Sequence, residues 1–342
     1  MGRTTLRDVA ELSGFSVTTV SYVLNDIPGK RIPDSTKERV QAAAAQLAYT
    51  PNRLAQGLRR RRSDTIGFVG DHVATSPHAG QSIQGAQDAA AARGSILVLM
   101  NTGADEDLEN REIRELRDRQ VDGIVYAAEY HRVLTPPAAL EGIPTVLLDA
   151  RSTESGWSSV VPDEAGGAAA AVTELLEHGH RRIAFVNNED DIPASSLRLD
   201  GVRQALAAAD LALAPDMLTQ HPSEARGGFL GALTVLDRPA HERPTGLFCF
   251  NDRMALGAYQ AAQELGLRVP QDVSIVGFDN QELIAASLRP GLTTVALPHY
   301  DMGRWAVDTL MDSIDSTRKE RPRYETLPCP LVRRGSVAAP PG

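Results

Sequence analysis

The chain has 342 residues, of which 42% are hydrophobic and 23% charged, so it is long enough for two or three folded domains. Its formal net charge of −9 excludes nucleic-acid affinity spread over the whole chain. Residues 1–62, however, hold eleven Lys or Arg against five Asp or Glu, a net charge of +6, which leaves −15 on the other 280 residues. This asymmetry predicts a small basic module joined to a large acidic one.

The cysteines and the distribution of apolar residues indicate the kind of compartment in which the protein works. Cys249 and Cys329 lie in no CxxC or Cys/His spacing, so we expect reduced, packed thiols and neither a metal site nor a cofactor. The opening stretch MGRTTLRDVAELSG has no apolar run behind its arginines, and no run of about eighteen apolar residues occurs in the sequence. We therefore expect a cytoplasmic protein without membrane contact.

The stretch TLRDVAELSGFSVTTVSYVLND predicts two short helices separated by a turn at Gly14. Thr4 or Thr5 is expected to cap the first helix and Ser16 the second. Apolar residues at helical spacing form an inner face on each helix: Leu6, Val9 and Ala10 on the first, and Val20, Val23 and Leu24 on the second. The outer face of the second helix then consists of Val17, Thr18, Ser21 and Tyr22.

Two short helices around a glycine turn are typical of a helix-turn-helix motif, whose second helix enters the major groove of DNA. A third helix is predicted over residues 34–47, with Val40, Ala43, Ala44 and Leu47 inward. Three helices in fifty residues with a positive charge form the kind of module that binds DNA. The alternative interpretation is three core helices of a generic bundle.

The stretch NRLAQGLRRRRSD, residues 52–64, places Leu54, Ala55 and Leu58 on one side of a predicted helix beside four arginines. Pro51 biases Thr50 away from helix, and Asn52 is a good N-cap. A helix of about two turns is marginal alone, so it is expected to fold only against a partner. The alternative is a plain basic linker.

From Thr65 onward, predicted strands and helices alternate, which indicates parallel sheets covered by helices on both faces. A first set has strands at residues 65–71, 95–101, 121–127 and 143–149, with helices at 81–94 and 105–120. A second set has helices at 168–179, 195–210 and 253–266, with strands at 181–188, 246–251 and 273–279. Two sets in tandem predict two similar lobes.

Polar side chains follow these strands, where ligands bind in open parallel sheets. They are Asp71, Asn101, Asp149, Asn187, Asn188, Asn251, Asp252 and Asp279. Acids and amides at strand ends form paired hydrogen bonds with vicinal hydroxyls, so we expect a sugar-like ligand. The same residue types also end strands and cap helices for structural reasons.

Motifs of catalysis are missing from the sequence: it has no GxSxG, HExxH, P-loop or GxGxxG. His178 and His180 are two residues apart, so they do not share one helical face, and we expect both to help cap the preceding helix. We therefore expect no catalytic residues.

Several of these stretches together resemble the lactose-repressor/galactose-repressor (LacI/GalR) family of bacterial transcription regulators. They are TLRDVAELSGFSVTTVSYVLN, STKERVQAAAAQLAYTPNRLAQGL, TIGFVGD, GHRRIAFV, RLDGVRQAL, FCFNDRMALGA and VSIVGFDN, which span nearly the whole chain in order. The resemblance implies a helix-turn-helix domain at residues 1–50, a hinge helix and basic linker at 51–63, and an effector-binding and dimerisation domain at 64–342. That last domain would be a two-lobed α/β fold of the periplasmic-binding-protein type.

The family further implies a homodimer, or a tetramer, that binds a palindromic double-stranded DNA operator and responds to a small-molecule effector, here a sugar. Val17, Thr18 and Tyr22 match base-reading positions, and Ser16, Thr19 and Asn25 match backbone contacts. Many members carry Arg where this chain has Tyr22, so a guanine preference there is not expected. Lys30 and Arg31 either meet phosphates or form a solvated basic loop. Leu58 matches the residue that wedges into the minor groove, with Ala55 at the helix pair and Arg59 near phosphates. The complete set of expected DNA contacts adds Thr5, Leu6, Ser21, Tyr49, Asn52 and Arg53.

For the effector, the resemblance selects Arg198 as a clamp for polar groups and Asp279 as the acid facing it, unless the two form only a salt bridge between lobes. Asn251 and Asp149 also match family ligand positions, whereas Leu297 stands where many members carry Gln. Asp71, Asn101 and His78 complete the expected effector set, although a lone loop histidine is more often just solvated.

The sequence therefore predicts a repressor whose operator affinity depends on an effector. The alternative is a solute-binding protein or carbohydrate enzyme with an N-terminal interaction module.

Overall fold

The computed structural model describes residues 4–25, 30–49, 62–76, 80–316, 318 and 321–341. The chain forms two compact units, Met1–Ser63 and Asp64–Gly342. Among the described residues, no helix is both long and apolar enough to cross a membrane.

The first unit contains three helices: α1 (Leu6–Ser13), α2 (Val17–Leu24) and α3 (Asp34–Gln46). Their starts and ends follow from local hydrogen bonding. The Asp8 amide donates to Thr5 Oγ1 (3.4 Å), while the Thr5 amide donates to Asp8 Oδ2 (2.7 Å), a capping box. Gly14 ends α1 at φ +75°, and Ser16 Oγ accepts the Thr19 amide at 3.1 Å to start α2.

A small apolar core joins the three helices. Val9, Val20 and Val40, one from each helix, are fully buried, and Leu6, Val23, Leu24 and Leu47 pack against them. The predicted inner faces are therefore confirmed, and each of the three helices contacts the other two.

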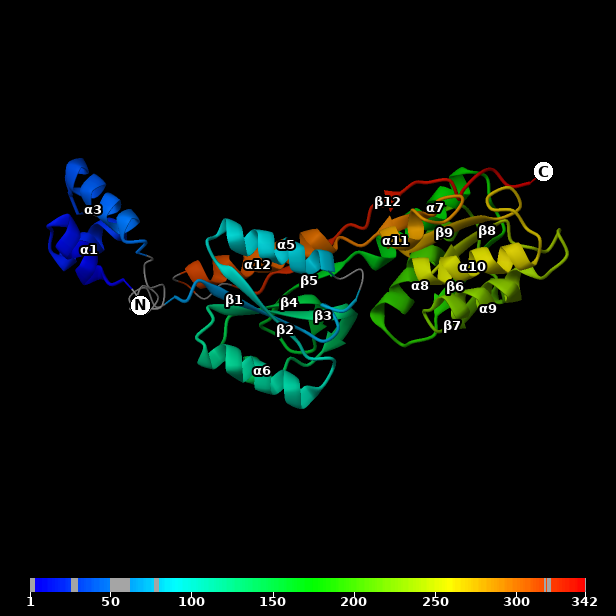
Figure 1. Ribbon diagram of the computed structural model, residues 1–342. Helices are drawn as coiled ribbons and strands as arrows, with labels where there is room; N and C mark the ends of the chain where they lie inside the picture. The colour runs from blue at the N-terminus through cyan, green and yellow to red at the C-terminus, as the bar shows by residue number, and fades with distance from the viewer. Residues whose placement is uncertain are drawn as a thin grey trace. The chain divides into compact units, whose positions relative to one another are not determined.

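The first lobe of the second unit is a six-stranded sheet in the order β11-β5-β4-β3-β1-β2, joined throughout by parallel pairings. Its strands are β1 (Thr65–Gly70), β2 (Ile96–Asn101), β3 (Gly123–Leu134), β4 (Thr145–Ser152), β5 (Ser158–Pro162) and β11 (Tyr324–Leu327). The helices α5 (Gly80–Ala92) and α12 (His299–Asp315) lie on one face of this sheet, and α6 (Glu106–Asp118) on the other (Figure 1). A short 3₁₀ helix, η1 (Ala138–Leu140), follows β3.

The second lobe is a six-stranded sheet in the order β12-β10-β9-β8-β6-β7, parallel except for the β10–β12 pair. Its strands are β6 (Ile183–Asn188), β7 (Leu218–His221), β8 (Gly246–Cys249), β9 (Ser274–Asp279), β10 (Thr293–Ala296) and β12 (Leu331–Val332). Its helices are α7 (Glu164–Glu177), α8 (Pro193–Ala208), α9 (Ala225–Leu236), α10 (Asp252–Glu264) and the short α11 (Glu282–Ala285), with η2 (Pro215–Met217) before β7.

Alternation along the strands places helices on both faces of this second sheet. Phe185, Phe248 and Phe278 share one face, where Phe278 meets α7 near Gly167. The neighbouring Gly277 points to the opposite face, where a Cβ would meet Asp252 of α10. The predicted strand–helix alternation is therefore correct, with parallel sheets covered on both sides.

The prediction of two consecutive lobes was incomplete, because the chain crosses between the lobes more than once. After β10, α12 returns to the first lobe and packs on α5, β11 then pairs with β5, and β12 rejoins the second sheet. The strands β11 and β12 escaped the sequence patterns because they are only four and two residues long. The 17-residue helix α12 was also not predicted. The helix α9 was also missed because it contains three glycines; at Gly228 a Cβ would collide with the backbone of Met254 in α10.

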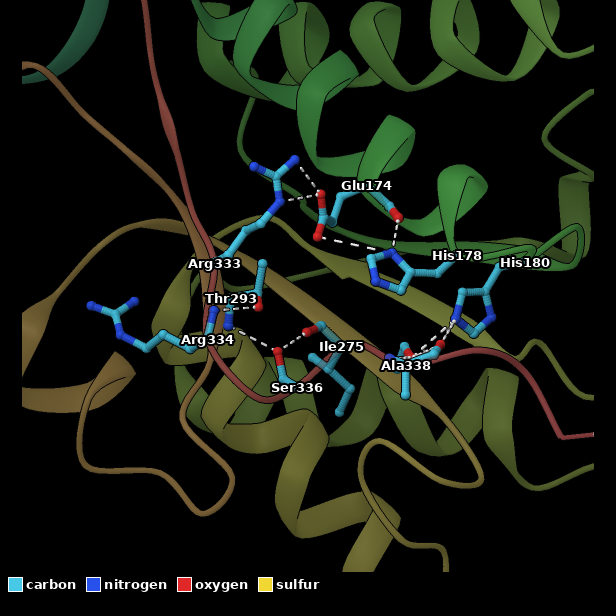
Figure 2. Close-up of polar contacts among 10 residues, drawn as sticks. Glu174, His178, His180, Ile275, Thr293, Arg333, Arg334, Ser336 and Ala338 are labelled. Carbon is cyan, nitrogen blue, oxygen red and sulfur yellow. Dashed lines mark hydrogen bonds and ion pairs between the residues drawn. The ribbon is translucent and has the colours of Figure 1, made fainter.

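The segment after β12 runs along the second lobe and is held by side chains from several elements (Figure 2). Ser336 Oγ donates to the Ile275 carbonyl (2.6 Å) and accepts the Thr293 amide (2.8 Å), while Arg333 Nη2 lies 2.8 Å from the buried Glu174 carboxylate. His180 caps α7 through its backbone amide, which donates to the Leu175 carbonyl at 3.1 Å, but its side chain takes no part: the residue is fully buried and contacts the Ala338 carbonyl through Nε2 at 2.8 Å.

The neighbouring His178 does meet the prediction. It is the C-cap residue of α7, and its Nδ1 lies 2.8 Å from the Glu174 carbonyl. The two histidines therefore have different roles although only Gly179 separates them, since Gly179 adopts φ +96° and turns the chain inward.

Candidate functional site

A cavity of about 240 Å³ lies between the two lobes of the second unit, at the carboxyl ends of strands from both sheets. The first lobe and the crossover to it contribute Glu129, Tyr130, His131, Asp149, Leu297 and His299. The second lobe contributes Glu164, Asn188, Asp190, Ile192, Ala194, Arg198, Ser223, Phe250, Asn251, Arg253 and Asp279. This is the position where open parallel sheets bind ligands.

The guanidinium of Arg198 is the centre of this cavity's polar network. Pro193 begins α8, and Arg198, one and a half turns later, points inward and is 3% exposed. Its Nε donates to Glu164 Oε2 at 2.7 Å, its Nη1 donates to the Phe250 carbonyl, and Asp279 Oδ1 lies 3.6 Å from Nη1. The rings of Phe278 and Phe250 cover the guanidinium at 3.6 and 4.3 Å from its carbon to the ring centroids.

Burial disfavours the charged form of each group in this network. Burial raises the pKa of the Glu164 carboxyl, although the adjacent Arg198 acts in the opposite direction. For Arg198, burial acts against the cation, but the carboxylates of Glu164 and Asp279 raise its pKa, so it remains charged. The network is therefore a desolvated ion pair with a second acid within reach.

Asp149 lies in the buried part of β4, which continues to Ser152 instead of ending at Asp149 as predicted, and it reaches the same cavity. Its residue is 3% exposed, its backbone has φ +56°, and its Oδ1 has no hydrogen-bond partner among the described residues. Burial, followed by repulsion from Glu164, raises the pKa of this carboxyl well above its usual range. A buried oxygen without a partner at a cavity wall is a place for a ligand's donor group.

Asp279 and Asn251 reach the cavity from strand ends of the second lobe. Asp279 has φ +97° and Asn280 φ +50°, and this turn is held by Arg334, which donates to Asn280 Oδ1 at 2.8 Å. Gln281 Nε2 donates to Asp279 Oδ2 at 2.9 Å. Asn251 caps α10 by accepting the Met254 amide at 2.8 Å, so its structural role accompanies its place in the wall.

Four of the predicted effector residues, Asp149, Arg198, Asn251 and Asp279, therefore lie together on one cavity. Asp71 and Asn101 end β1 and β2 but are not in its wall: Asp71 is paired with Arg132, and Asn101 Oδ1 accepts the Ala74 amide at 3.3 Å. His78 lies outside the described residues. Leu297 is in the wall and makes that part of it apolar, as its side chain implies.

Sequence reasoning missed several wall residues. His131 was overlooked because β3 continues to Leu134 instead of ending at residue 127; burial, then the charges of Arg151 and Arg198, lower the pKa of His131 to about 4. Glu164 opens α7 and carries no sequence signal for a ligand site. Phe250 was within reach, since it directly precedes Asn251 at the end of β8.

The outer face of α2 in the first unit presents the residues predicted to read DNA. Val17 is 42% exposed, and Ser16 and Thr18 are exposed beside it. Tyr22 is half-buried, and Lys30 Nζ lies 5.5 Å from its ring centroid.

One expected outer-face residue is placed differently. Ser21 is 7% exposed, so the expectation that it lies on the outer face is wrong. It directly follows the buried Val20, and its small side chain lies under Asn25, whose Nδ2 donates to Ser21 Oγ at 3.0 Å. Of the other predicted contacts, Thr5, Lys30 and Arg31 are exposed, Thr19 is half-buried, and Leu6 and Tyr49 pack against the core. Asn52, Arg53, Ala55, Leu58 and Arg59 lie outside the described residues.

Two family models match the chain. Residues 5–52 match that of bacterial regulatory proteins of the lacI family, and residues 172–337 match a periplasmic binding protein-like domain. The first match covers α1 to α3, and the second begins within α7 and ends in the segment after β12.

Similar proteins extend the match over nearly the whole length. The chain is 32% identical to the ribose operon repressor of Escherichia coli (strain K12) over 338 residues, covering 97% of this chain and 99% of that one. It is 34% identical to the HTH-type transcriptional repressor PurR of Pectobacterium carotovorum subsp. carotovorum (strain PC1), covering 98% of both. Among solved structures, the lac repressor dimer bound to operator and the anti-inducer ONPF superposes with a TM-score of 0.79 at 28% identity, over 99% of this chain and 100% of that one.

Proposed function

The chain belongs to the lacI family of bacterial regulatory proteins and is a DNA-binding transcriptional regulator, and on this basis we propose that it represses transcription under the control of a small sugar-like molecule bound between its two lobes. The observation that carries the effector part of this proposal is the cavity that both lobes line, with Arg198 clamped at its centre. At about 240 Å³ the cavity is below the range typical of drug-sized ligands, which favours a monosaccharide-sized molecule.

The chemistry of the wall supports a polyhydroxylated ligand. Asp149 and Asp279 offer carboxylate oxygens, and Phe250, whose ring centroid lies 4.3 Å from the Arg198 guanidinium carbon, is the wall aromatic that can contact the apolar face of a sugar ring. The relatives include a repressor named for a ribose operon, which points to the same ligand class.

Effector control requires that the ligand favour one arrangement of the lobes. The wall takes Asp149 from the first lobe and Arg198 from the second, so a ligand touching both has different contact energies in different lobe arrangements. That difference is the coupling free energy between effector and DNA. Because the chain crosses between the lobes more than once, the two lobes are joined by several chain segments and not by a single linker, and the lobes move about these segments.

On the DNA side, we propose that Val17, Thr18 and Tyr22 contact bases, with Ser16, Thr19 and Asn25 contacting the sugar-phosphate backbone. The exposure of Val17 and Thr18 supports this assignment. The hinge segment, residues 51–63, is proposed to place Leu58 in the minor groove of a palindromic operator. A homodimer is the matching assembly, as in the related lac repressor dimer on its operator. We further propose that the protein acts without catalysis, in the cytoplasm where its DNA target lies.

An electrophoretic mobility shift assay tests the proposal. The purified chain is titrated onto its own upstream DNA and onto a scrambled fragment of equal length and composition, at two or more salt concentrations, with and without neutral monosaccharides. We expect a salt-sensitive complex selective for the natural fragment, with an affinity that one of the sugars changes. Equal binding to both fragments would overturn the assignment of the DNA face. Selective binding that no small molecule alters would overturn the effector control.

A further inference from the structure

The inter-lobe cavity has an excess of acidic side chains. Its described wall contains five carboxylates and two guanidiniums. Three of the carboxylates are on the buried side of the wall. Asp149 is 3% exposed, and the side chains of Glu164 and Asp279, which flank Arg198, are 2% and 8% exposed. Asp190 and Arg253 are exposed, so water screens their charges.

The one buried cation of this wall is already engaged. Arg198 is hydrogen-bonded to Glu164 and to the Phe250 carbonyl, it has Asp279 within 3.6 Å, and both ring contacts cover its faces. An anionic ligand would have to displace a buried carboxylate from Arg198, which leaves that carboxylate without a partner.

The wall groups without a hydrogen-bond partner among the described residues include no cation: they include Nδ1 of His131, whose pKa burial lowers to about 4 so that the ring is neutral, and an oxygen of Asp149. Asp149 Oδ1 is a buried acceptor with no partner among the described residues, and it faces a wall that also contains Glu164 and Asp279. Burial of an acceptor without a donor is unfavourable, so a ligand that brings a donor to Oδ1 gains the most there.

Resting on the proposed function, we propose that the effector is an uncharged or cationic polyol that donates a hydroxyl or ammonium hydrogen to Asp149, and that phosphate esters and sugar acids are excluded from the cavity. The selection against anions follows because burial and the neighbouring acids disfavour any further negative charge in this space, and because the described wall has no buried guanidinium that is not already paired. The raised pKa of Asp149 has the same origin, since the same carboxylates and the same burial disfavour negative charge at this point.

A thermal-shift screen of the full-length chain tests the selection with matched ligands. The probes are ribose with ribose 5-phosphate, and glucose with glucosamine, glucose 6-phosphate and gluconate, extended to other monosaccharides in the same sets. We expect melting shifts only from uncharged or amine-bearing members, with at least about a tenfold weaker affinity for the ester or acid of the same sugar. An ester or acid that binds as tightly as its parent sugar would overturn the proposal.

Two carboxylate variants locate the effect. Asp149→Asn should weaken the effective ligand by about tenfold or more, since it replaces an acceptor oxygen beside the ligand's donor, while raising the melting temperature of the ligand-free chain because a buried acid is neutralised. Asp190→Asn, an equal change at an exposed position of the same wall, should alter neither by a comparable amount. Equal effects of the two variants on affinity would show that Asp149 does not bind the ligand.

The same chains in the mobility shift assay separate this inference from the proposed function. A response of DNA binding to phosphate esters alone would overturn the charge selection and leave effector control in place. A chain that binds its operator selectively and responds to no probe in any set would contradict both.

Discussion

The helix α2, which is proposed to read DNA, and the inter-lobe cavity, which is proposed to bind the effector, place their proposed contact residues in opposite surroundings. On α2, the proposed contact residues Val17 and Thr18 are exposed, and the small core beneath them, around Val20, is separate from them. In the cavity, Arg198 and Asp149 are buried, and both interact electrostatically with Glu164. The side chains proposed to bind the ligand are therefore also part of the folded core. We therefore expect a change at Val17 or Thr18 to alter DNA binding with little effect on stability, whereas a change at Arg198 or Asp149 should alter stability as well.

The largest expected effect is that of Arg198→Ala. Removal of one partner from a buried ion pair leaves Glu164 and Asp279 without their cation, which destabilises a fold by about 3–5 kcal/mol. We expect chemical denaturation of the second unit at lower denaturant concentration and no effector binding. Arg253→Ala, at an exposed wall position, is the matched control and should change stability little. Equal stability of the two variants would break the comparison.

The next effect concerns the hinge. Leu58→Ala should leave thermal unfolding unchanged and weaken operator binding by about tenfold to a hundredfold. Unstacking a base step costs a few kcal/mol, and the alanine side chain is too short to offset this cost by inserting between the bases. Fluorescence anisotropy with labelled operator measures this affinity. An unchanged affinity would remove the wedge from the DNA-binding account, and a lowered melting temperature would show that Leu58 is a core residue.

A recognition change is expected from Tyr22→Arg. Arginine can make two hydrogen bonds to guanine, so the variant should gain a guanine preference at one position of each half-site, worth about 1–3 kcal/mol. Selection from a randomised operator library measures it. The melting temperature should stay close to that of the parent chain, since Tyr22 is only half-buried. A large loss of stability without a new preference would assign Tyr22 to the core of the first unit.

The smallest effect is a pH dependence at His180. Burial lowers the pKa of this imidazole in the folded chain, so the unfolded chain takes up a proton first as the solution is acidified. The stability that neutral His180 contributes is full above its unfolded pKa, about 6.5, and falls as the pH drops below that value. His180→Gln should therefore reduce the loss of melting temperature between pH 7 and pH 5. His178→Gln, at the partly exposed cap, serves as the control.

Much of this structure was predictable from local patterns, and the failures share one cause. The helices of the first unit, their caps at Thr5 and Ser16, and the strands β1 to β4, β6, β8 and β9 follow from apolar periodicity and polar end residues. Ser21 was misplaced because a small polar residue beside a helix's inner face can point either way. The helix α9 was missed because its glycines serve a close approach to α10, which is a tertiary requirement.

The sequence by itself determined the two-part charge distribution, the helix-turn-helix pattern and the strand ends near which Asn251 and Asp279 stand, because these depend on residues close together in the chain. Only the tertiary structure decided that α12 and β11 return to the first lobe, that Glu164 pairs with Arg198, and that Asp149 keeps an oxygen without a partner. These contacts depend on which segments, far apart in the sequence, pack together away from water. In such a buried site, burial and neighbouring charges determine what each side chain can bind, and residue type alone does not.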